Sequence, residues 1–209
     1  MPKRMILTSI VMVAVFIFAG FGNVAAEMSP AELAKASEAK AVATSDEPLT
    51  TELIMKKVDE AVALLGKKGA AVFPEFQGLN TQFIFAGTYI WIHDQNGVMR
   101  MHPIKYKLNG RNLINMSDST GKLFFAVMNE VAEEEGGGWV DYMWPKPGEK
   151  KPSPKISYVK QVTYGGDTFV AGCGTYDPTV IEKIDPPGMS GVGFCRGGSR
   201  YRNYFEFQC

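Results

Sequence analysis

The chain has 209 residues, with 22 basic and 22 acidic side chains and only two histidines, His93 and His102. This charge balance excludes the strongly basic surface that nucleic-acid-binding proteins need. Two histidines exclude a histidine-rich metal centre within one chain, and we expect no metal and no cofactor. Gly172-Cys173-Gly174 lacks the spacing and the lysine of a phosphate-binding loop.

Residues 1–26 have the features of a signal peptide. Lys3 and Arg4 precede a long apolar run, and the small residues Val24-Ala25-Ala26 follow it. We therefore expect cleavage after Ala26 and a periplasmic or secreted protein. The alternative is that the segment stays attached and anchors the chain in the cytoplasmic membrane.

Two helical regions follow in the chain. Residues 27–49 are expected to form a polar helical or flexible linker, in which Ser29-Pro30-Ala31-Glu32 predicts a helix start with a capping box. A longer helix is predicted from Thr50 or Thr51 to Gly66, followed by a short helix over 70–76. The longer helix has one apolar stripe, made of Ile54, Val58, Ala61, Val62 and Leu65.

The rest of the chain is dominated by predicted strands. A helix after Asp118, with an apolar stripe from Leu123 to Val131, separates the second strand from the third. Short turns between neighbouring strands predict an α+β fold, with an antiparallel sheet of about five strands and helices packed mainly on one face. The expected strands are Gly87–Asp94, Val98–His102, Trp139–Trp144, Ile156–Val162 and Thr168–Tyr176.

Alternation along the first strand assigns its side chains to two faces. Tyr89, Trp91 and His93 fall on one face, with Ile90 and Ile92 on the other. We expect His93 to be exposed, because it precedes the turn that Asn96-Gly97 predicts.

The second strand adds polar groups beside the first. Arg100 is expected to share a face with His102 and to point to solvent or to an acidic neighbour. Asp94 is expected to bond the backbone of the turn.

Five separated motifs follow one another along the chain: Tyr89-Ile90-Trp91-Ile92, Asp94-x-x-Gly97, Met101-His102-Pro103, the run from Gly138 to Gly148, and Lys155-x-Ser157-Tyr158-Val159. Together they resemble the single Cache domain (Cache type 2) of extracellular sensors, over about Thr50 to Asp177. The resemblance implies a PAS-like antiparallel sheet behind a long N-terminal helix, outside the cytoplasmic membrane, as in chemoreceptors and sensor kinases. It also implies a small organic ligand, often a short carboxylate, bound on the sheet.

The candidate ligand contacts combine hydrogen-bond donors with aromatic walls, as a short carboxylate requires. Each has a structural alternative: the aromatic residues as core, His102 as a partner of a backbone carbonyl, and Lys155 as a solvated loop end. The candidates are Tyr89, Trp91, His102, Tyr142, Trp144, Lys155 and Tyr158.

These expectations describe a ligand-binding sensor domain over residues 50–182, without enzymatic activity, followed by an irregular tail over 183–209. It would act in signal transduction or chemotaxis through a separate membrane receptor, kinase or transporter, and the resemblance adds a homodimer through the long helix. The alternatives are a membrane-tethered or truncated receptor or sensor-kinase fragment, and a small hydrolase using His102 with Asp94 or Cys173. Cys195 and Cys209 could pair or stay free.

Overall fold

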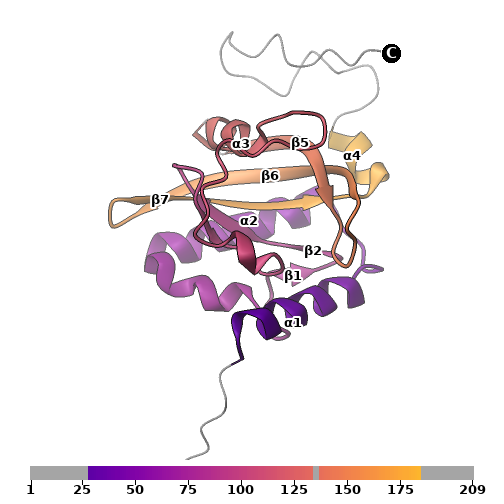
Figure 1. The fold of residues 1–209 in the computed structure, drawn as a ribbon, viewed down its shortest axis with the longest axis horizontal. Helices are drawn as coiled ribbons and strands as arrows, with labels where there is room; N and C mark the ends of the chain where they lie inside the picture. Colours follow the sequence, from indigo (N-terminus) through magenta and orange to yellow (C-terminus); the bar gives the residue numbers. More distant parts are fainter. Residues whose placement is uncertain (1–27, 134–136, 185–209) are drawn as a thin grey trace, which may run out of the picture.

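The computed structural model describes residues 28–133 and 137–184, so the expected signal peptide, Cys195 and Cys209 lie outside the described part. Its centre is a five-stranded sheet in the order β4-β3-β7-β6-β5, in which every neighbouring pair is antiparallel (Figure 1). The predicted α+β fold with a PAS-like antiparallel sheet is confirmed. The strands are β3 (Trp91–Asp94), β4 (Met99–Met101), β5 (Gly138–Pro145), β6 (Pro152–Tyr164) and β7 (Asp167–Thr175).

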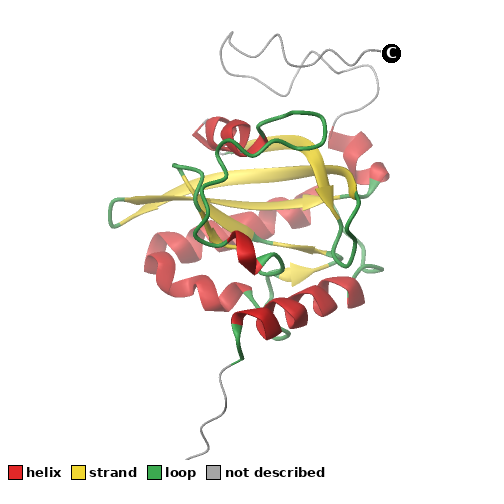
Figure 2. Cartoon of the chain, in the orientation of Figure 1, coloured by secondary structure: helices red, strands yellow, loops and turns green. Residues whose placement is uncertain are grey.

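Helices cover both faces of the sheet (Figure 2). Helix α2 (Thr51–Lys68) packs on β6 and β7, and the side chain of its N-cap, Thr50, accepts a hydrogen bond from the Leu53 amide. The 3-10 helix η1 (Gly69–Phe76) continues it on the same face. Helix α3 (Phe124–Glu133) lies on the opposite face, against β5 and β6. The sheet face away from α2 therefore lies under α3.

The predicted alternation of the first strand is confirmed. Tyr89 and Trp91 belong to the buried cluster under α3, whereas Ile90 and Ile92 belong to the cluster under α2. The strand itself is broken into two parts. Its first part, β2 (Thr88–Tyr89), pairs with β1 (Ile84–Phe85) in a separate two-stranded sheet.

A β-bulge in β4 overturns one expectation. Ile92 pairs with Met101 but His93 pairs with Met99, which leaves Arg100 as an extra residue. Arg100 therefore points to the α2 face, where its guanidinium lies 5.7 Å from the Phe169 ring. The expectation that Arg100 shares a face with His102 is wrong, because alternation holds only where the pairing is regular.

Asp94 is the acidic neighbour that was expected for Arg100. One carboxylate oxygen of Asp94 lies 3.3 Å from the Arg100 guanidinium, and the other accepts the amides of Asn96 and Val98. The expected turn role of Asp94 is confirmed.

Three short elements were not predicted. The β1–β2 hairpin turns through Ala86 and Gly87, both with positive φ. A 3-10 turn, η2 (Tyr106–Leu108), follows β4, and α4 (Pro178–Ile184) follows β7. No helix within 28–133 or 137–184 is both long and apolar enough to cross a membrane.

Helix α1 (Pro30–Ala43) begins with the predicted capping box at Ser29 and packs against β1. The buried hydroxyl of Ser37 donates to the Leu33 carbonyl and accepts the Gly78 amide at 2.8 Å. These bonds tie α1 to the segment that precedes the sheet. The boundary placed between residues 49 and 50 stays a prediction.

We expect Ser37→Ala to lower the free energy of unfolding by about 1–3 kcal/mol, because it leaves the buried Gly78 amide without an acceptor. Urea denaturation measures this change. Ser45→Ala is the matched control on an exposed position of the following turn, with an expected change below about 0.5 kcal/mol. Equal effects of the two substitutions would contradict a structural role for α1.

Candidate ligand-binding site

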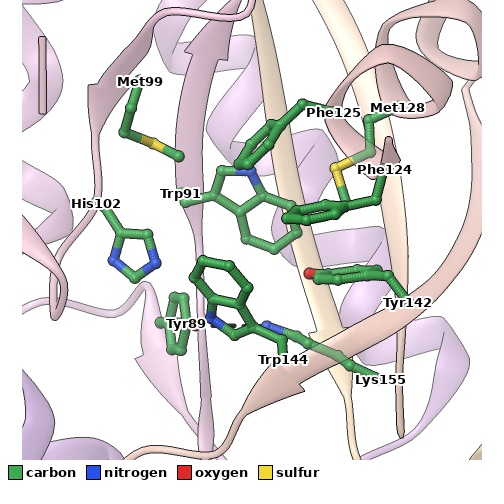
Figure 3. Close-up of a pocket in the computed structure, with 10 residues that line it drawn as sticks. All are labelled: Tyr89, Trp91, Met99, His102, Phe124, Phe125, Met128, Tyr142, Trp144 and Lys155. Carbon is green, nitrogen blue, oxygen red and sulfur yellow. Dashed lines mark hydrogen bonds between the residues drawn. The ribbon is translucent and has the colours of Figure 1, made fainter. Parts of the chain in front are cut away.

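Ten side chains converge between the sheet and α3 and enclose one small cavity (Figure 3). The space left at their centre holds about one water molecule. Six of the seven expected contact residues lie here. The lining is Tyr89 from β2, Trp91 from β3, Met99 from β4, His102 just after β4, Phe124, Phe125 and Met128 from α3, Tyr142 and Trp144 from β5, and Lys155 from β6.

Lys155 is the only charged side chain of the lining, and it is 1 % exposed. Its ammonium lies 4.5 Å from the Tyr89 ring centre, 4.9 Å from that of Tyr176 and 5.0 Å from that of Trp91. Within the described part of the chain, no carboxylate comes within 4.0 Å of it. Burial without a counter-ion lowers the pKa of Lys155 to about 7. The alternative that Lys155 is a solvated loop end is wrong, because the side chain is enclosed.

His102 is held in one tautomer by the backbone that follows it. Its Nδ1 accepts the amides of Ile104 at 3.2 Å and of Lys105 at 3.0 Å, so Nε2 carries the hydrogen. Burial, together with the charges of Lys155 and Lys105, lowers the pKa of His102 well below its usual value. The ring is thus a neutral imidazole that can donate through Nε2–H.

Two tyrosines add hydroxyl groups to the polar end of the cavity. The Tyr89 oxygen accepts from Trp144 Nε1 at 3.2 Å and from Lys155 Nζ at 3.5 Å, which leaves its own hydrogen to donate. The Tyr142 hydroxyl bonds the Ser157 hydroxyl at 3.1 Å. Burial raises the pKa of both tyrosines, so both stay protonated. The polar end therefore offers N–H and O–H donors and no carboxylate.

The opposite end of the cavity is apolar. Met99, Phe125 and Met128 lie on the far side of Trp91 from Lys155 (Figure 3). Phe124 stacks on Tyr142, with ring centres 4.7 Å apart and planes 5° apart. Sequence reasoning missed these contacts, because an apolar stripe on a helix does not reveal which sheet face it covers.

Two glycines of β7 form the floor beneath these side chains. A Cβ on Gly172 would lie 2.6 Å from Cη2 of Trp91, and a Cβ on Gly174 would lie 2.9 Å from Cε of Lys155. Both distances are shorter than side-chain packing allows. The sequence signal for this floor is the alternation of glycines in Gly172-Cys173-Gly174.

Tyr158 does not reach the cavity. It lies in the cluster under α2, with its ring 5.4 Å from that of Trp139. Neighbouring residues of a strand point to opposite faces, and Ser157 takes the cavity side. Tyr158 is therefore not part of the candidate site.

His93 is buried, and the expectation that it is exposed is wrong. Its Nδ1 accepts from Trp91 Nε1 at 3.3 Å, and its Nε2 lies 3.0 Å from Oδ1 of Asn129 on α3. Burial lowers the pKa of His93 to about 4. The difference arises because α3 covers this end of β3.

Comparison with known proteins identifies the domain. Residues 79–177 match the family model of the Cache domain. This part of the chain is a Cache domain. The expected family is thus confirmed, and with it a class of domain that binds ligands in signalling proteins.

Relatives of this Cache domain are signalling proteins. The methyl-accepting chemotaxis protein McpP of Pseudomonas putida is 36% identical over 109 residues, which are 50% of this chain and 20% of McpP. The sensor histidine kinase MctS of Rhizobium johnstonii is 28% identical over 95 residues, 46% of this chain and 20% of MctS. The match thus spans about a fifth of each relative.

A solved methyl-accepting chemotaxis protein from Vibrio parahaemolyticus has the same fold. It superposes with a TM-score of 0.51 at 23% identity, covering 74% of this chain and 100% of that chain.

We expect the stability of the ligand-free protein to rise with pH because of Lys155. Between pH 7 and its usual value of 10.5, the amine is neutral in the folded state and charged in the unfolded state. The unfolded state then binds more protons, so raising the pH favours folding. From pH 7 to pH 9 the wild type should gain about 2 kcal/mol relative to Lys155→Met, as urea denaturation at each pH measures. Parallel pH profiles of the two proteins would contradict burial of an unpaired amine.

Proposed function

We propose that this Cache domain acts outside the cytoplasmic membrane and binds a short organic carboxylate in the cavity around Lys155. One observation carries the proposal: Lys155 is 1 % exposed, and no carboxylate of the described residues lies within 4.0 Å of its ammonium. The Tyr89 hydroxyl and the His102 imidazole, which line the same cavity, can donate hydrogen bonds. An anion that accepts from these groups would stabilise the charged form of Lys155.

The carboxylate fits the polar end of the cavity. Its oxygens would accept from Lys155 Nζ, from the Tyr89 hydroxyl and from Nε2–H of His102. Hydrogen bonds to a charged donor are stronger than neutral ones, so Lys155 would contribute most of the affinity. Trp91 and Tyr142 would form the walls of the cavity.

The apolar end limits the length of the ligand. Met99, Phe124 and Met128 would contact a tail of few carbons, because the enclosed space is small. Entry of any acid needs a side chain to move. Trp144 is the candidate gate, since it is the one lining residue that is only partly buried, and it lies beside the half-exposed Lys105.

The names of the relatives support a role in signalling. McpP is a chemotaxis protein and MctS a sensor kinase, and the matched part is a fifth of each. We therefore propose that the domain reports ligand binding to a membrane receptor, kinase or transporter. A domain tethered at the membrane, or a fragment of such a receptor, is the alternative. Dimerisation through the long helix α2 stays a proposal.

The hydrolase alternative gains no support from the geometry. Asp94 bonds Arg100 and the turn, and is not among the hydrogen-bond partners of His102 within the described part of the chain. Cys173 lies in the cluster under α2, where burial raises the pKa of its thiol to about 11. A protonated thiol is a poor nucleophile.

The proposal is tested by calorimetry and thermal shift with acetate, propionate and butyrate. We expect at least one acid to bind the wild type and to raise its melting temperature, since ligand at 100 times the Kd stabilises by about 2.7 kcal/mol. Lys155→Met should abolish this binding. Tyr158→Phe is the matched control outside the cavity and should bind as the wild type does. A folded wild type that binds none of these acids, or binding that survives Lys155→Met, would overturn the proposal.

Affinity for the acid should fall as the pH rises. Ligand binding requires charged Lys155, and the pKa of this group in the free protein is about 7. Between pH 6 and pH 8.5 we expect Kd to increase about 10- to 30-fold, because the binding-competent fraction declines. Calorimetry at several pH values measures this change. A Kd that is independent of pH over this range would contradict Lys155 as the anchor.

A further inference from the structure

The indole of Trp91 lies between the cavity and Gly172 of β7. It lines the cavity, and Lys155 Nζ lies 5.0 Å from its ring centre (Figure 3). The position of the Trp91 indole determines the depth of the cavity, because β7 beneath it cannot move away. That strand, β7, is central in the sheet and is packed on its other face by α2.

Gly172 lies directly opposite Trp91 in the β3–β7 register. Its φ lies outside the left-handed region, so its backbone conformation is open to any residue. Glycine is required here because any side chain would clash with the Trp91 indole. A Cβ would lie 2.6 Å from Cη2 and 2.7 Å from Cε2 of the indole. With β6 paired to Gly172 on the other side, an added methyl group could only lift the ring towards the cavity.

His93 holds the N–H of the same indole, at Nε1, which is bonded to Cε2. The Asn129 amide donates through Nδ2 to the Gln95 carbonyl at 2.8 Å, so its Oδ1 faces His93 as an acceptor. His93 must then carry its hydrogen on Nε2. Its Nδ1 is left as the acceptor of the Trp91 indole N–H at 3.3 Å.

We propose that Gly172 and His93 are positioning residues that hold the indole of Trp91 flat against β7 and thereby set the depth of the cavity. Gly172 permits the ring to lie low, and His93 prevents it from turning. The effect on ligand affinity rests on the proposed function. The effect on the packing of Trp91 does not, and the two are measured separately.

Trp91→Phe provides the test, because phenylalanine lacks both the second ring over Gly172 and the N–H that needs His93. In the wild-type background, Gly172→Ala and His93→Leu should each lower the melting temperature by about 5 °C or more. In the Trp91→Phe background each should lower it by less than half as much. Trp139→Phe, on the other face of the sheet, is the matched control and should leave both losses unchanged.

Affinity is measured with the same variants and with acetate and propionate as probes. Gly172→Ala should weaken binding at least about tenfold, since the lifted ring fills the cavity. If the wild type binds neither these two acids nor butyrate, the proposed function fails, whereas the melting temperatures in the two backgrounds still test the positioning role. Equal losses of melting temperature in the wild-type and Trp91→Phe backgrounds would overturn the proposal, as would a Gly172→Ala chain that fails to fold in both.

Discussion

An ammonium group enclosed by aromatic rings, with no carboxylate within 4.0 Å among the residues that the structure describes, is the constraint on which this structure depends. Removing the Lys155 charge from water is unfavourable, and the rings of Tyr89, Trp91 and Tyr176 return only part of its hydration energy. Burial therefore favours the neutral amine, and this lowers the pKa of Lys155. In the proposed function the same arrangement favours an anion, because a cation would meet the like charge of Lys155.

The surrounding fold provides the enclosure. Alternation along β2 and β3 directs Tyr89 and Trp91 to one face of the sheet, and α3 covers that face with apolar side chains. Glycine at 172 and 174 lets two large side chains lie low on β7. The cavity is therefore shaped by residues that do not line it, as well as by those that do.

Much of this could be predicted from the sequence, and the failures have physical causes. Strand alternation is local, so the faces of Tyr89 and Trp91 were correct. The bulge in β4 depends on pairing between strands, and for that reason Arg100 was placed on the wrong face. The burial of His93 and of Lys155 depends on α3 and on the ends of other strands, which neighbouring residues in the sequence do not encode.

Lysine-selective NMR measures the charge of Lys155 most directly. The Cε signal of Lys155, assigned with Lys155→Met, is followed through a pH titration with and without saturating acetate or propionate. We expect a pKa near 7 in the free protein and a clearly higher pKa when the acid is bound. A pKa near 10.5 in the free protein, unchanged by either acid, would contradict this expectation.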